Sequence, residues 1–180
     1  MAEPKDIPSS TVTGHAFAEG PVWLHAVPLG EFHHPVYGRL VFTRERLQRF
    51  ADNIRRRIRG IDLAIDYEHG QDLAKGRRAA GWIVGAEVRA DGLWLLARFT
   101  DEARREIHAG HWRYLSPDYQ DEWTDARGQR WRDVLFGAAL TNRPFLKELA
   151  PIAPSGERGG VYLPPGDVMF LRDQPRREPG

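Results

Sequence analysis

The spacing of apolar and polar residues divides the chain into short strands separated by turn residues. Apolar runs of strand length occur at 21–30, 39–42, 61–69, 111–123 and 130–142. Residues 81–100 hold two more runs around the turn "RADG", where Gly92 can adopt a positive φ, so we expect a hairpin there. Many short strands without a regular strand–helix alternation predict an α+β fold. We expect a mainly antiparallel barrel or sandwich with helices on its outside.

Two segments show helical spacing instead. Apolar residues recur every three or four positions after Thr43, which is a suitable N-cap, and Gly60 is placed to end this helix. A shorter helix is predicted after Thr100, with acidic residues in its first turn and a glycine after its end. Both helices have one apolar face, so we expect each to pack against the strands.

Composition changes at both ends of the chain. Residues 1–18 are polar and predict a flexible leader, 19–153 hold the predicted strands and helices, and 154–180 form a Pro-, Gly- and Arg-rich tail. The leader lacks the apolar centre of a secretory signal. No stretch approaches the roughly 18 apolar residues that span a bilayer. We therefore expect one soluble intracellular domain without a membrane segment.

Charge and cysteine content exclude several functions. The 180 residues include 26 basic and 25 acidic side chains, a net charge of +1, which argues against nucleic acid as the main partner. Five arginines lie between positions 49 and 59, and we interpret them as a solvated helix face rather than a phosphate-binding or scaffold-docking patch. The chain has no cysteine, so disulfides, cysteine zinc sites and cysteine nucleophiles are excluded. The histidines do not have metal-site spacing, and we expect neither a metal nor a cofactor.

A nucleophile in this chain must come from Ser, Thr, Lys or a carboxylate. Of the four serines, only Ser116 lies inside the predicted domain, in "YLSPD". Pro117 has no amide proton, so we expect normal strand pairing to stop at the serine and leave its hydroxyl at a strand end. A single serine in a strand is more often structural, so this signal needs a partner.

His69 is the candidate partner, at the end of "AIDYEHG". If this segment is a strand, Tyr67 and His69 share one face, while Asp66 and Glu68 point the other way. A histidine within reach of Ser116 could take the hydroxyl proton during attack on a carbonyl and return it to the leaving amine. The separation of 47 residues does not show that the two side chains meet.

Four motifs in order make the chain resemble a known family. They are "IDYEHG", "AAGW", "GLWLLARFTDEARREIHAGHWRYLSPDY" and "GAALTNRPFL", which together cover about residues 20 to 150. The chain is similar in these to the Mu-like prophage I protein, a Mu-type prophage protease among the capsid maturation (prohead) proteases of tailed phages.

The resemblance implies a fold similar to the herpesvirus assemblins, a β-barrel surrounded by helices. It implies that 19–153 is a serine endopeptidase domain with His69 as general base and Ser116 as nucleophile. Such proteases act in the host cytoplasm, inside the procapsid, on scaffold protein, on themselves and often on capsid or portal proteins. By the same analogy we expect a homo-oligomer.

The third catalytic member is left open by the resemblance. Assemblins use a second histidine about 25 residues after the serine, where this chain has Thr141 and Asn142. We favour Asn142 as the residue that orients the His69 ring. The other candidates are Thr141, Asp66, Glu68 and Asp118.

A competing hypothesis is a non-enzymatic internal scaffold or docking protein with the same fold. The presence of both Ser116 and His69 favours the enzyme, because a scaffold needs neither. Arg143, beside the "TN" dipeptide, is either an assistant of catalysis or a surface arginine.

Overall fold

The computed structural model describes residues 20–152. The predicted leader at 1–18 and tail at 154–180 lie outside the described residues. The described part contains two α-helices and one short 3-10 helix besides its strands. The strands are β1 (Val22–Pro28), β2 (Gly30–His34), β3 (Gly38–Phe42), β4 (Leu63–Tyr67), β5 (Gly81–Arg89), β6 (Gly92–Phe99), β7 (Tyr114–Thr124) and β8 (Arg130–Thr141). The fold is therefore mostly β and fits the predicted α+β class.

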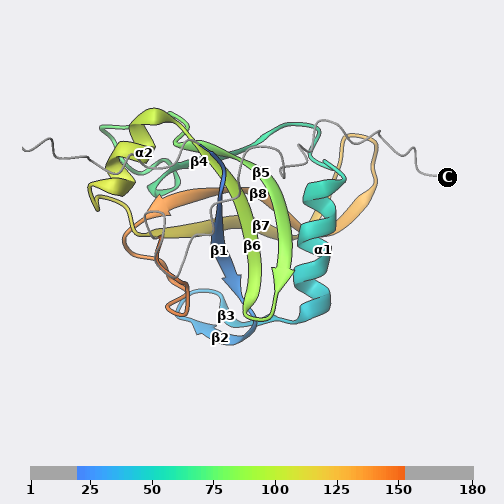
Figure 1. The fold of residues 1–180 in the computed structure, drawn as a ribbon. Coiled ribbons are helices and arrows are strands. Elements are labelled where there is room, and N and C mark those ends of the chain that lie inside the picture. The colour runs from blue at the N-terminus through green and yellow to red at the C-terminus, as the bar shows by residue number, and fades with distance from the viewer. Residues whose placement is uncertain (1–19, 153–180) are drawn as a thin grey trace, which may run out of the picture.

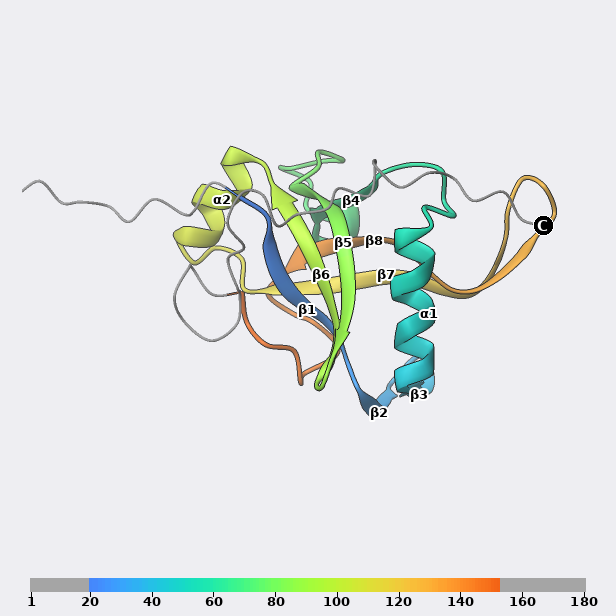
Figure 2. The same ribbon diagram turned by 45° about the vertical axis from the view of Figure 1, so that its right-hand side comes forward.

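Six strands form one curled sheet in the order β1-β6-β5-β4-β8-β7, and β2 pairs with β3 in a separate small sheet. Within the large sheet β4 and β8 run parallel, and the other neighbours are antiparallel. The curl brings the layer of β1, β6 and β5 across the layer of β8 and β7, as Figures 1 and 2 show. The predicted barrel is thus a half-barrel in which one sheet folds over on itself.

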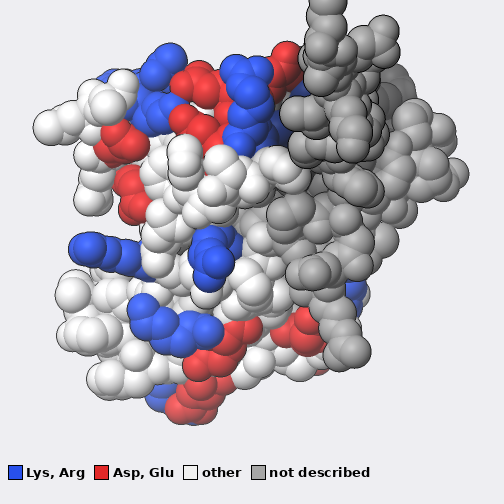
Figure 3. Space-filling view, turned by 60° about the vertical axis from the view of Figure 1, so that its left-hand side comes forward, with Lys and Arg blue, Asp and Glu red and all other residues white. Residues whose placement is uncertain are grey.

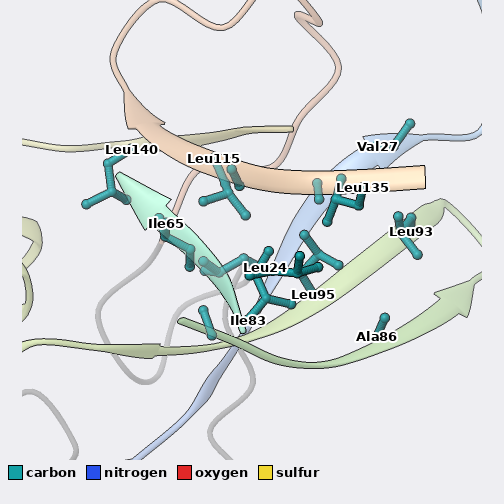
Figure 4. Packing of buried hydrophobic residues seen from close by; sticks show 14 of the residues in the cluster. Leu24, Val27, Ile65, Ile83, Ala86, Leu93, Leu95, Leu115, Leu135 and Leu140 are labelled. Carbon is teal, nitrogen blue, oxygen red and sulfur yellow. The ribbon is translucent and has the colours of Figure 1, made fainter. Parts of the chain in front are cut away.

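The core lies inside this curl. Figure 4 shows leucine, isoleucine and alanine side chains from both layers pointing toward one another. Leu24, Leu95 and Ile65 meet residues of the opposite layer such as Leu135 and Leu140, and each is at most 2% exposed. Burial of such side chains contributes roughly 1.5–3 kcal/mol each, which makes this core the main source of stability.

Both predicted helix starts are confirmed. Helix α1 (Arg44–Arg55) begins after Thr43, whose hydroxyl accepts from the Arg46 amide at 3.2 Å, and helix α2 (Asp101–His108) begins after Thr100 in the same way. Helix α1 packs its buried face against β5 and β8, at one flank of the half-barrel (Figure 2). It ends at Arg55 rather than at Gly60, because Arg57 has a left-handed φ of 52°.

The five arginines between positions 49 and 59 match the predicted solvated face in part, since Arg49 and Arg56 are exposed and the other three are half-buried. Arg59 lies 3.8 Å from the centre of the Phe136 ring, and Arg56 lies 4.9 Å from the centre of the Trp131 ring. Arg57 pairs with Asp62, while the remaining two arginines bond to Asp52, Ala86 and Asp133. Several of these side chains thus contact the sheet through their polar ends or ring faces while remaining at the surface.

Two glycines are required by close backbone approach. The predicted hairpin is formed by β5 and β6, and a Cβ on Gly92 would lie 2.1 Å from the Val27 carbonyl oxygen. A Cβ on Gly137 in β8 would lie 2.7 Å from the Ala64 carbonyl oxygen in β4. Gly137 therefore permits the close contact between β4 and β8 on which the candidate site depends.

The strand predictions differ from the structure in three details. Strand β2, which contains His33 and His34, was not predicted. The strand predicted at 61–69 ends at Tyr67. Strand β7 continues past Pro117, which still lies opposite Ala138. Proline is tolerated there because β7 is the last strand of the sheet, where a missing amide proton need not break a ladder.

Charged side chains of both signs alternate on the surface. On the face drawn in Figure 3, Lys and Arg side chains lie beside Asp and Glu side chains rather than in one field. Across residues 20–152 no helix has the length and apolar character needed to cross a membrane.

Candidate active site

The pairing of three neighbouring strands sets the floor of the site. Residues that face each other in a sheet project to the same side. Asp66 in β4 lies beside Ala139 in β8, and Ala139 lies opposite Ser116 in β7. The next row, which contains Tyr67 and Leu115, belongs to the core. Asp66 and Ser116 therefore share the face of the sheet that points away from the core.

A left-handed turn brings His69 to that face. Strand alternation would send His69 to the core side with Tyr67, as the sequence predicted. Instead Glu68, His69 and Gly70 all have positive φ, of 49°, 54° and 74°. This turn breaks the alternation, so the expectation that Asp66 and His69 point apart is wrong. Each left-handed non-glycine residue costs on the order of 1–2 kcal/mol.

The turn places His69 against Ser116. The distance from His69 Nε2 to Ser116 Oγ is 3.0 Å, within hydrogen-bond range. Ser116 is 7% exposed, whereas His69 is exposed to solvent. The hydroxyl is thus held on a rigid strand, and the ring reaches it from the solvent side. If Nε2 is the unprotonated nitrogen, Ser116 donates to it, which is the arrangement needed for general-base catalysis.

Asp66 is the carboxylate that interacts with the histidine. Burial raises the pKa of the Asp66 carboxyl, and the charge of His69 together with a hydrogen bond from the His69 backbone opposes that rise. One carboxyl oxygen, Oδ1, is buried without a hydrogen-bond partner among residues 20–152. Asp66 thus keeps an acceptor to spare on the face of the sheet that carries Ser116, while its hydrogen bond to His69 is to the backbone.

Glu68 is bound to the end of β8. Its Oε2 accepts from the Thr141 hydroxyl at 3.0 Å, and its Oε1 accepts from the Asn142 amide at 3.3 Å. Hydrogen bonds to a charged group contribute about 1.5–3 kcal/mol each, enough to offset the cost of the left-handed backbone. The parallel pairing of β4 and β8 makes this possible, because both strands end at the same edge.

The structure gives Asn142 partners other than the His69 ring. Its side-chain amide donates to the carbonyl oxygen of His111 at 2.7 Å, while its backbone bonds to Glu68. The predicted role of Asn142 in orienting the ring is therefore not supported by its contacts. The backbone amide of Arg143 donates to the Thr141 hydroxyl at 3.0 Å, and the Arg143 side chain is exposed.

The loop after His69 is attached to helix α2 through Lys75. Lys75 Nζ donates to Glu102 at 2.6 Å and also pairs with Glu106, both on α2. The same ammonium lies 5.0 Å from the centre of the Tyr67 ring. These contacts raise the pKa of Lys75 and keep it charged. The His69 segment is thus attached to β8 on one side and to α2 on the other.

Sequence reasoning named Glu68, Thr141 and Asp66 only as alternatives for the third catalytic member. It missed the contact between Glu68 and Thr141, which fixes the turn. The signal was a pair of polar residues at the end of each of two apolar strands, "EH" and "TN". Asp118, the remaining alternative, is exposed on β7 next to Gly137, and its charge acts on both Asp66 and Arg59.

The histidines and carboxylates of residues 20–152 form no group of three or more that could hold a metal ion.

Comparison with known proteins identifies the family. A model of the Mu-like prophage I protein, N-terminal domain, matches residues 24–153. That match includes the whole site and most of the chain. Searches of curated proteins and of solved structures gave no match. The chain therefore belongs to the Mu-like prophage I protein family.

Proposed function

We propose that the protein is a serine endopeptidase that cleaves scaffold protein, and itself, during maturation of a phage head. Family membership supports a phage-related role. One observation carries the enzymatic part of the proposal: the 3.0 Å contact between His69 Nε2 and Ser116 Oγ. A hydroxyl and an imidazole in this relation are the minimal set for acyl transfer.

In the acylation step, Ser116 Oγ attacks the carbonyl carbon of the scissile peptide bond. Its proton passes to His69 Nε2 as the new C–O bond forms. When the tetrahedral intermediate collapses, the C–N bond breaks and His69 gives that proton to the departing amine. The products are a free amine and an ester between Ser116 and the acyl part of the substrate.

In the deacylation step, His69 takes a proton from water, and the hydroxide attacks the ester carbon. Collapse of this second intermediate releases the acid, and the proton returns to Ser116. The exposure of the His69 ring supports this step, because water can reach it. Asp66 is the residue we assign to hold the ring and stabilise the imidazolium.

The test compares wild type with Ser116→Ala. Each protein is incubated with scaffold protein and by itself, and products are followed by gel and mass spectrometry. A fluorescent fluorophosphonate, which reacts with activated serines independently of the cleavage sequence, is applied in parallel. We expect cleavage and labelling by wild type alone, with the label on Ser116.

Two outcomes would overturn the proposal. One is a wild type that neither cleaves nor is labelled although it is folded, and the other is equal behaviour of both proteins. Either result would favour the internal scaffold or docking protein, which requires no reactive hydroxyl.

A further inference from the structure

We propose that Glu68 is a positioning residue, held by Thr141, that fixes the backbone turn presenting His69 to Ser116. The catalytic consequence rests on the proposed peptidase function, whereas the structural part stands on the contacts alone. We define the Glu68 latch as Glu68 with its two donors, Thr141 and Asn142.

The latch is saturated by its donors. The Thr141 hydroxyl reaches Oε2 at 3.0 Å and the Asn142 amide reaches Oε1 at 3.3 Å, so each carboxyl oxygen of Glu68 has a partner. Thr141 is only 3% exposed, and its oxygen also accepts from the Arg143 amide at 3.0 Å. Because a lone pair of the Thr141 hydroxyl oxygen faces the Arg143 amide, the hydroxyl proton is directed at the Glu68 carboxylate.

This arrangement separates Glu68 from Asp66, although the two carboxylates are close in sequence. Both carboxylate oxygens of Glu68 accept hydrogen bonds from residues at the end of β8, so Glu68 acts on the backbone of the turn. Asp66 keeps one buried oxygen without a partner, on the face that His69 occupies. Glu68 sets the position of the His69 imidazole, and Asp66 is available to set which of its ring nitrogens carries the proton.

The turn needs such a contact because its backbone is strained. Glu68 and His69 have φ of 49° and 54°, a conformation that side chains other than glycine and asparagine rarely adopt. Without the latch, the chain would relax toward extended backbone, and His69 would leave Ser116. A displacement of about 1 Å in a reacting group costs up to roughly a hundredfold in rate.

A matched pair of variants tests the latch. Thr141→Val keeps the shape of the side chain and removes the hydroxyl, while Thr141→Ser keeps the hydroxyl and removes a methyl group. We expect Thr141→Val to lower the rate of fluorophosphonate labelling of Ser116 by about tenfold to a hundredfold. Thr141→Ser should label within about threefold of wild type. Labelling of Thr141→Val at the wild-type rate, or equal loss in both variants, would contradict the proposal.

A second measurement does not depend on catalysis. Hydrogen exchange of the Asn142 amide, and the NMR resonances of the His69 ring, report the latch directly. Both should change in Thr141→Val and in Glu68→Gln while amides of β5 and β6 keep their protection. Unchanged Asn142 exchange in Thr141→Val would overturn the latch even if labelling fell.

The two proposals fail in different ways. If wild type is never labelled and never cleaves, the peptidase proposal falls, and the exchange measurement still decides whether Glu68 holds the turn. If wild type is active but Thr141→Val is equally active with an unchanged His69 ring, the latch falls alone.

Discussion

Two regions of the molecule hold an aspartate next to left-handed backbone, buried in one and half-buried in the other, and they use it differently. At one end of the sheet, Asp133 has φ 55° and is 4% exposed. Its carboxylate bonds to Arg46 and Arg49, each at 2.7 Å, and Asn53 donates to its carbonyl oxygen at 3.1 Å. At the other end Asp66 lies behind the left-handed turn of His69 with one oxygen unpaired.

The difference separates a polar cluster with a structural role from the cluster that we propose to be reactive. Around Asp133 nearly every donor and acceptor is matched, so the strain of the backbone is offset and the cluster joins α1 to β8. Around Asp66 the polar groups are under-matched, and a histidine and a serine meet at the surface. Backbone strain therefore does not mark a functional site by itself; strain together with unused hydrogen-bonding capacity does.

The largest expected effect is the loss of activity in His69→Asn. Asparagine tolerates left-handed backbone but cannot act as the base, so fluorophosphonate labelling of Ser116 should fall by about a thousandfold or more. The melting temperature should stay within a few degrees of wild type. Strong labelling in this variant would remove His69 from the mechanism.

For Asp133→Ala we expect a loss of stability without a loss of labelling. This change leaves the partly buried Arg46 with one carboxylate partner, Asp121, instead of two, and should cost about 3 kcal/mol, or roughly 6–12 °C in melting temperature for a chain of this size. Labelling per folded molecule should match that of wild type at a temperature where both are folded. Differential scanning fluorimetry checks the first part, and a large loss of labelling would show that the two regions are coupled.

An intermediate effect is expected for Asp66→Asn. Labelling should fall by about tenfold or more, because the amide cannot stabilise the imidazolium. Burial raises the pKa of Asp66 above its unfolded value, so the charged carboxylate opposes folding at neutral pH. The variant should therefore be as stable as wild type or melt a few degrees higher at pH 7. Asn142→Ala, which leaves the Asn142 backbone contact in place, is the control and should label faster than Asp66→Asn.

The smallest effect concerns His25, a third buried polar group. Its Nδ1 accepts from the Ala150 amide at 3.3 Å, its Nε2 is unpartnered within the described chain, and burial lowers its pKa. The unfolded chain therefore binds a proton more readily than the folded one, and stability should fall as pH drops below about 6.5. The contribution is at most about 1.4 kcal/mol per pH unit. Melting temperatures between pH 7.5 and 5.5 should fall less steeply for His25→Gln than for wild type; equal slopes would refute this.

Local chemistry allowed much of the fold to be predicted. Thr43 and Thr100 were identified as N-caps because a hydroxyl before an apolar-periodic segment satisfies free amides. The hairpin at Gly92 followed from its turn residues. Ser116 and His69 were singled out because the chain lacks cysteine and offers few other nucleophiles, and the structure places them 3.0 Å apart.

The remaining features depend on contacts between distant segments. The left-handed backbone at Glu68 is held by Thr141, 73 residues away, so no local pattern predicts it. Asp66 and Ser116 lie on the same face of the sheet because β8 lies between β4 and β7. The alternation of residues along one strand cannot reveal this order of strands. Normal strand pairing was expected to stop at Ser116, because the position of this strand at the sheet edge was unknown.

The position of β8 has a consequence for synthesis of the chain. It is the last strand of the described residues to leave the ribosome, yet it lies between β4, which leads into His69, and β7, which carries Ser116. A nascent chain that has emerged only as far as β7 contains His69 and Ser116 but lacks β8, the strand between β4 and β7. The arrangement of His69 against Ser116 seen in the folded protein therefore requires β8 to have been synthesised.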